Sequence, residues 1–202
     1  MKKMCKVVIM SDNTYQQIVE EARQLFATKG LTNTTMNDIA KASNKGRRTL
    51  YTYFNNKQDI YLAVITSEMN RLYERLEAVV KKDLPPNEKL EEYIDARLEG
   101  IREIVIRNGS LRAEFFQDIA EVEHARKKIS KSEIDLLRKI LDEGVAKGKF
   151  IVHNSLATAT ILHCAFKGLE VPYIRNAFYE VGIERNRIRC LITDFMLYGI
   201  MR

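Results

Sequence analysis

Proline occurs at only three positions in this chain of 202 residues, Pro85, Pro86 and Pro172. Because proline breaks helix interiors, the long segments between these positions are free to be helical. Apolar residues in those segments recur at spacings of three and four, as on one face of a helix, and no segment alternates as a half-buried strand does. With 46% hydrophobic residues the chain can bury a core. The sequence therefore predicts an all-α fold.

Capping signals divide the first third of the chain into short helices. A first helix should begin near Asn13 and end at Gly30, which suits the left-handed position after a helix. Thr35 and Asp38 form a capping-box pattern that begins a second helix, expected to run to about Ser43.

The same signals place a turn and two more helices. Asn44 tolerates a left-handed turn, and a third helix should follow from about Arg47 to Asn55. Asn56 with Asp59 caps a long fourth helix that breaks at 83–86. The remaining helices are expected at 87–107, 110–122, 124–147, 155–170 and 184–200.

Positive charge is concentrated in this first third. The chain carries a formal charge of +6. Up to Leu62, ten Lys and Arg residues face five Asp and Glu residues, so +5 of that excess lies there. Such an asymmetry favours a polyanionic partner for this end of the chain.

Residues 44–54, NKGRRTLYTYF, contain basic, hydroxyl and aromatic side chains in one short segment. Two short helices with a tight turn, the second of them basic, form the layout of a helix-turn-helix that inserts its second helix into the DNA major groove. Arg47 and Arg48 can donate paired hydrogen bonds to guanine. Leu50 and Phe54, four residues apart, should point inward. The alternative interpretation is a solvated basic face beside packing tyrosines.

Residues 16–65 also closely resemble the DNA-binding region of the tetracycline repressor (TetR) family of bacterial regulators. The matching string is IVEEARQLFATKGLTNTTMNDIAKASNKGRRTLYTYFNNKQDIYLAVI. Its LF, the glycine after the first helix, TT, IA, TLY-x-YF and NK stand at the spacing of the family. The chain departs from the family pattern at Asn44, Lys45, Gly46 and Arg48, so the operator sequence is not inferred from the resemblance.

This resemblance implies roles for single residues. Thr35 matches a phosphate contact, Asn37 a base reader, and Arg47 the principal base-reading position. The full set of candidate DNA contacts is Thr35, Asn37, Lys45, Arg47, Arg48, Thr49, Tyr51, Thr52, Tyr53 and Lys57.

The resemblance further implies two domains and a dimer. We expect a flexible leader at 1–12, the helix-turn-helix DNA-binding domain at 13–62, and a helical effector-binding and dimerisation domain at 63–202. Candidate pocket residues are Tyr93, Arg97, Leu111, Phe115, Phe116, His163, Phe166 and Tyr173. An apolar stripe on the last helix, with residues of the helix before it, predicts a dimer interface or, alternatively, part of the core. These residues are Leu162, Phe166, Leu169, Ile188, Leu191, Ile192, Phe195 and Gly199.

Other classes of protein find less support. His124, His153 and His163 with Cys164 have no metal-binding or catalytic spacing, so neither an enzyme, a metal site nor a cofactor is expected. Three scattered cysteines argue against a disulfide framework and, with no membrane-length apolar run, favour a cytoplasmic protein.

The expected function is a sequence-specific transcriptional regulator: a homodimeric repressor released from a palindromic operator on double-stranded DNA by a small, mostly apolar effector. A helical protein-interaction module without specific DNA binding is the alternative.

Overall fold

The computed structural model describes residues 13–108 and 120–201. Three short helices form one end of the molecule: α1 (Asn13–Lys29), α2 (Met36–Ala42) and α3 (Arg47–Tyr53). Their ends follow the capping signals. Gly30 has a φ of 84° and Asn44 a φ of 52°, so the chain turns in the left-handed region at both of the predicted points.

The α2 helix begins with a complete capping box. The Thr35 hydroxyl accepts a hydrogen bond from the Asp38 amide at 3.1 Å, and the Asp38 carboxylate accepts one from the Thr35 amide at 2.9 Å. Gly46 is the N-cap residue of α3 and has no side chain that could cap the helix. Short helices of this kind need tertiary packing to persist.

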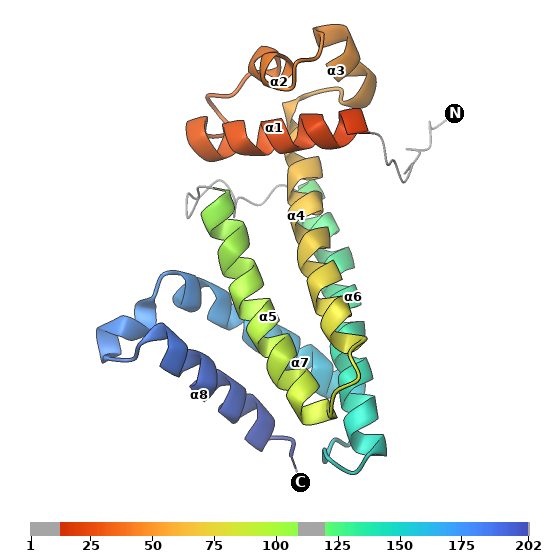
Figure 1. The fold of residues 1–202 in the computed structure, drawn as a ribbon, viewed down its shortest axis with the longest axis vertical. Coiled ribbons are helices and arrows are strands. Elements are labelled where there is room, and N and C mark those ends of the chain that lie inside the picture. The colour runs from red at the N-terminus through yellow and green to blue at the C-terminus, as the bar shows by residue number, and fades with distance from the viewer. Residues whose placement is uncertain (1–12, 109–119, 202) are drawn as a thin grey trace.

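One long helix joins this end to the rest of the molecule. The α4 helix (Lys57–Val80) begins where the Asn56 side chain accepts a hydrogen bond from the Asp59 amide at 2.8 Å. Its first turns, with Ile60 and Val64, belong to a core cluster shared with α1, α2 and α3. Its later turns belong to a second, larger cluster. Figure 1 shows α4 running from the upper three-helix unit down along α6.

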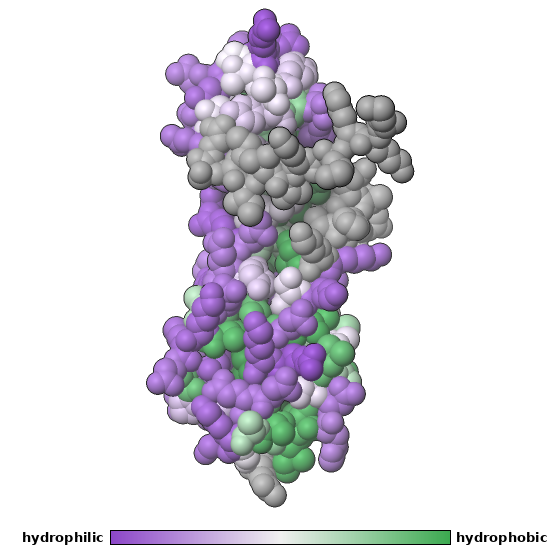
Figure 2. All heavy atoms as spheres, turned by 90° about the vertical axis from the view of Figure 1, so that its right-hand side faces the viewer, coloured by the Kyte–Doolittle hydropathy of each residue, from purple (hydrophilic) through white to green (hydrophobic). Residues whose placement is uncertain are grey.

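The second cluster is the core of a helical body. It is formed with α5 (Pro86–Arg107), α6 (Ala120–Ala146), α7 (Ser155–Ile174), the 3₁₀ helix η2 (Ala177–Val181) and α8 (Arg185–Tyr198). Apart from one isolated antiparallel bridge between Phe150 and Met201, the described residues contain no strand pairing. The all-α prediction is therefore confirmed. On the face drawn in Figure 2, hydrophobic surface gathers over the body, whereas the three-helix end is mainly hydrophilic.

Three boundaries in the body differ from the expectation. The predicted break near residue 123 is absent, because α6 is continuous from Ala120 to Ala146. The α7 helix continues through Pro172 to Ile174, since a proline in the last turn removes only one helical hydrogen bond. The η2 helix, which begins after Asn176 at a φ of 56°, was not predicted. The start of the expected 110–122 helix lies outside the described residues, as does the 1–12 leader.

Candidate nucleic-acid interface and ligand cavity

The three-helix unit turns one face of α3 inward and another outward. Leu50 and Phe54 are buried in its core, as expected from their spacing. The exposed candidate DNA contacts are Thr35, Asn37, Arg47, Arg48, Tyr51 and Thr52, and the half-buried ones are Lys45, Thr49, Tyr53 and Lys57. Helix α3 therefore presents two arginines and several hydroxyl groups to solvent, while its opposite face packs in the apolar core of the unit.

Two of the hydroxyl groups on this surface already have partners. The Thr35 hydroxyl donates to the Asp38 carboxylate at 2.7 Å, a hydrogen bond that, with the Thr35 amide, lowers the pKa of Asp38. The Thr52 hydroxyl donates to the Arg48 carbonyl at 3.0 Å. A hydroxyl that donates internally still has oxygen lone pairs, but it must rotate to donate to a phosphate.

Lys57 has an internal role that its spacing did not reveal. Its ammonium nitrogen donates to the Leu31 carbonyl at 2.6 Å and lies 3.3 Å from the Thr32 carbonyl. Residues 31 and 32 belong to the turn between α1 and α2. The first residue of α4 therefore ties this turn to the start of the long helix.

A polar cluster joins the three-helix unit to the body. The Arg23 guanidinium on α1 donates to the Arg107 carbonyl at 2.8 Å and to both carboxylate oxygens of Glu20. Glu20 also accepts from Arg107 at 2.7 Å. Beside them, Asn108 donates to the buried carboxylate of Glu68 at 3.1 Å. Because the partners are up to 87 residues apart, no local pattern predicted this cluster.

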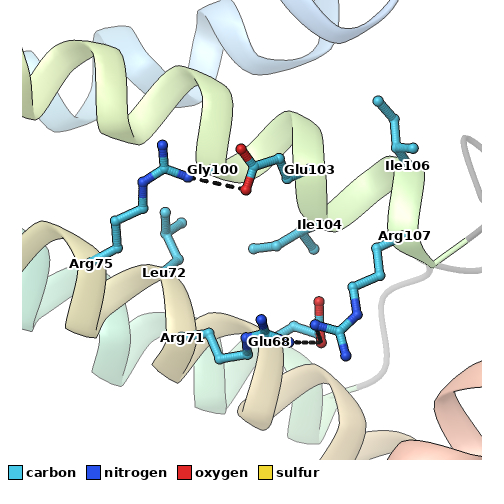
Figure 3. A pocket seen from close by; sticks show the side chains of 9 residues that line it. All are labelled: Glu68, Arg71, Leu72, Arg75, Gly100, Glu103, Ile104, Ile106 and Arg107. Atoms are coloured by element: carbon cyan, nitrogen blue, oxygen red, sulfur yellow. Dashed lines mark hydrogen bonds and ion pairs between the residues drawn. The ribbon is translucent and has the colours of Figure 1, made fainter.

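A cavity of about 520 Å³ lies next to this cluster, between α4 and α5. Figure 3 shows that its charged side chains face one another across the two helices. Arg75 lies 3.0 Å from Glu103, and Glu68 lies within 4.0 Å of both Arg71 and Arg107. Its charges are therefore mutually paired. The α5 helix approaches closely here, since a Cβ on Gly100 would come within 2.5 Å of Leu72 Cδ1.

A second cavity, of about 220 Å³, is lined by residues of α4, α5, α6 and α7. Of the predicted pocket residues, Arg97 and His163 line it. Tyr93, Phe166 and Tyr173 are instead fully buried in the core. Leu111, Phe115 and Phe116 lie outside the described residues.

The buried tyrosines have internal partners. The Tyr93 hydroxyl donates to the Glu133 carbonyl at 3.4 Å, and the Tyr173 hydroxyl donates to the Glu99 carboxylate. Burial is the main cause that raises the pKa of both phenols. They are neutral core groups.

Part of the predicted dimer surface is used inside the chain. Leu162, Phe166, Ile188 and Ile192 are buried in the body core, so a partner could not reach them without unpacking that core. Leu169 is half-buried, whereas Leu191, Phe195 and Gly199 are exposed. Ile161 on α7 and Tyr198 on α8 are exposed as well. Half of the residues named for the dimer surface are therefore on the inner side of the body, and the dimer interface stays a prediction.

Within residues 13–108 and 120–201, none of the helices combines the length and apolar character that a membrane crossing requires. The same ranges hold no group of three or more His, Cys, Asp or Glu side chains placed to bind a metal ion.

The capped α2, the left-handed turn at Asn44 and the exposed basic face of α3 define the chain as a helix-turn-helix transcriptional regulator. Residues 18–64 match the family described as "Bacterial regulatory proteins, tetR family". The match covers α2, α3 and parts of α1 and α4, so the helix-turn-helix unit of this chain is similar to that of this family.

Similar proteins match this chain over most of its length, in sequence or in structure. The fatty acid metabolism regulator protein of Bacillus subtilis is 29% identical over 138 residues, covering 67% of this chain and 70% of that protein. A transcriptional regulator from Cytophaga hutchinsonii matches in structure with a TM-score of 0.79 and 23% identity, over 95% of this chain and 100% of that one. The regulator FadR from Bacillus subtilis, solved with stearoyl-CoA, matches with a TM-score of 0.69 and 20% identity, over 92% and 98%.

Proposed function

We propose that the protein is a cytoplasmic, homodimeric repressor that reads a palindromic operator and releases it when a small ligand enters the helical body. The exposed basic face of α3 carries this proposal. The division into a DNA-binding domain at 13–62 and an effector domain at 63–202 belongs to it, with α4 contributing to the cores of both.

In this proposal, Arg47 and Arg48 read bases and the hydroxyl groups of α3 hold phosphates. Arginine matches the two acceptors of guanine in the major groove, whereas Thr and Tyr hydroxyls suit phosphate oxygens. Asn37 on α2 is exposed and is a further base reader. Lys45 and Lys57 add positive charge near the backbone.

The proposed dimer uses the outer face of α7 and α8. Phe195 and Tyr198 are 82% and 78% exposed, and Ile161 on α7 is 68% exposed. Large apolar side chains gathered on one face mark an interaction site. A twofold axis through this face would place two α3 helices in successive major grooves, about 34–36 Å apart or somewhat more.

The operator is released if ligand binding changes the separation of the two α3 helices. The cavity of about 220 Å³ is lined by residues of α4 to α7, including Met69 on α4. Because α4 also carries part of the DNA-binding core, a ligand that shifts α4 would move α3. The ligand must bind the two arrangements with affinities that differ, typically by about 1–3 kcal/mol.

Selection of bound sequences from a random duplex pool at physiological salt tests the proposal. We expect an enriched palindrome whose affinity greatly exceeds that for unrelated DNA. Equal, salt-sensitive binding to all sequences, or no binding, would favour the alternative, a helical protein-interaction module. Transcription from a promoter that carries the selected palindrome then separates a repressor from an activator.

A further inference from the structure

The smaller cavity combines apolar walls with buried charge. Its apolar lining comes from Met69, Ile101, Val105, Ile129 and Val171, each on one of the helices α4 to α7. The polar lining comes from Arg97, Ser130, Glu133, His163, Lys167 and Glu170. A purely apolar effector would leave this second group without a function.

Arg97 is the central charge of the cavity. Its side chain is buried, with the residue 5% exposed, and its Nε donates to Glu133 Oε2 at 3.1 Å while Nη2 donates to Glu170. Burial opposes the charged form, but the two carboxylates outweigh burial, so the pKa of Arg97 is raised. The remaining nitrogen, Nη1, is buried and has no hydrogen-bond partner.

His163 supplies a second unpartnered nitrogen. It is 4% exposed, and its Nδ1 lies 3.3 Å from Glu133 Oε2 in a contact without hydrogen-bond geometry. Its Nε2 has no partner. A buried polar group without a partner is costly, and such groups are characteristic of ligand sites.

The two nitrogens together indicate the chemistry of the missing partner. A guanidinium nitrogen can only donate, so the ligand must offer an acceptor to Arg97. A histidine ring nitrogen can donate or accept a hydrogen bond, so Nε2 of His163 can pair with an acid group. A carboxylic acid meets both requirements with its two oxygens.

The charges that line the cavity favour an anion over a cation. Arg97 and Lys167 offset Glu133 and Glu170, and both carboxylates are already paired with Arg97. A cationic ligand would place a second positive charge beside the unpartnered Nη1 of Arg97.

We propose that this cavity binds a small monocarboxylate with an apolar body, its carboxylate held by Arg97 and His163 and its body by the apolar wall. The inference rests on the proposed function and names the effector class. The small volume of about 220 Å³ suits an aromatic or short aliphatic acid. Lys167, exposed on α7, lies at the rim and favours entry of an anion.

Direct binding to the full-length chain tests this inference without DNA. Phenylacetate, benzoate and hexanoate are titrated calorimetrically beside the matching amides and beside phenethylamine. We expect saturable binding of at least one carboxylate, at least tenfold tighter than that of its amide, and no comparable binding of the amine. Equal binding of acid and amide, preference for the amine, or no binding by any of the carboxylates would overturn the inference.

Two variants with a matched control locate the site. His163→Gln keeps a hydrogen-bonding side chain but cannot become charged, and Arg97→Lys keeps the charge but lacks Nη1. Each variant should bind the carboxylate ligand roughly tenfold more weakly or worse, as expected for a lost charged hydrogen bond. His153→Gln changes an exposed histidine outside the cavity and should bind as the wild type does. Unchanged affinity in His163→Gln, with its thermal unfolding intact, would contradict the assignment.

DNA binding distinguishes this inference from the proposed function. A carboxylate that binds at the cavity and lowers operator affinity supports both. Binding without an effect on operator affinity supports the ligand class and contradicts release. A selected palindrome with no carboxylate binding would leave the DNA-binding proposal standing and reject the ligand class.

Discussion

The guanidinium of Arg23 donates to the main-chain carbonyl of Arg107 at 2.8 Å, which joins the first helix of the DNA-binding unit to the last residue of α5. Both groups lie at the junction of the two units, and Glu20 bridges the two arginine side chains. This contact holds α1 against the end of α5, and we expect it to help set the angle between the DNA-binding unit and the body.

Loss of the Arg23 contact should loosen that angle. Arg23→Gln should cost about 1–3 kcal/mol in free energy of unfolding, because the carbonyl and Glu20 lose a charged donor. We also expect the variant to discriminate less between operators whose half-site spacing differs by one base pair. Urea denaturation and operator titrations measure the two effects. Arg102→Gln, which changes an arginine paired within α5, is the control and should keep the spacing preference.

Arg47 and Lys57 should differ in how they affect DNA binding. Arg47→Ala should cost about 1–3 kcal/mol of binding free energy and relax the preference at one base pair. Lys57→Ala should weaken every sequence alike and lower the salt slope by about one. Because Lys57 also donates to the Leu31 carbonyl, its variant should lose about 1 kcal/mol of stability as well. The same profile for both variants across a panel of sequences would contradict the division into base reader and anchor.

The exposed face of α8 should determine the oligomeric state. Phe195→Lys places a charge where we propose that two chains meet, so it should shift the protein toward monomer and reduce operator affinity. Light scattering after size exclusion measures the mass. Val145→Lys, at an exposed apolar residue on α6, is the matched control. A dimer that survives Phe195→Lys at low concentration would place the interface elsewhere.

The ionised carboxylate of Glu68 should lower the free energy of unfolding at neutral pH. Burial raises the pKa of this carboxyl above its ordinary value of 4.5, and the Asn108 hydrogen bond offsets that only in part. A carboxyl whose pKa is raised by folding binds its proton more readily in the folded state. Its contribution to stability is therefore lost as the pH rises through the pKa of the folded state. The stability of Glu68→Gln relative to the wild type should therefore increase from pH 4 toward pH 7 or so.

Glu77→Gln provides the control with the opposite sign. A hydrogen bond from Lys81 lowers the pKa of Glu77, so its contribution is present above the ordinary pKa and is lost as pH falls. The stability of this variant relative to the wild type should decrease over the same rise in pH. Urea denaturation at several pH values measures both, and parallel curves for the two variants would contradict the pKa directions.

The Arg97–Glu133 pair should be costly to break and easier to replace. Arg97→Ala leaves the buried Glu133 carboxylate without its main partner and should cost about 3–5 kcal/mol. In the double variant Arg97→Met with Glu133→Leu neither charge remains, and most of this loss should be recovered. Urea denaturation compares the variants. A double variant as unstable as the single one would show that the pair stabilises the fold beyond satisfying its own charges.

Local sequence was sufficient for the three-helix unit. Thr35 with Asp38, and Asn56 with Asp59, are capping pairs three residues apart, and the structure contains both caps. Gly30 and Asn44 adopt the predicted left-handed turns. These features could be predicted because each depends on hydrogen bonds or steric limits within a few residues.

Apolar spacing identified the helices of the body but not which side of each faces inward. Ile192 and Phe195 lie one turn apart on α8, yet Ile192 is buried and Phe195 is exposed. Apolar residues recur at spacings of three and four on an inner face and on an outer face alike. The spacing therefore does not tell which residues of a stripe are buried. Only the packing of α8 against α5 separates the two.

The sequence by itself therefore determined the all-helical class, the caps and turns of the DNA-binding unit and the basic face of α3, since these follow from interactions within one helix or turn. Tertiary structure alone decided the Arg23–Arg107 junction, the internal partners of Lys57 and the charged cavity around Arg97 and His163. Those partners lie 25 to 84 residues apart, and only folding brings them within hydrogen-bonding distance.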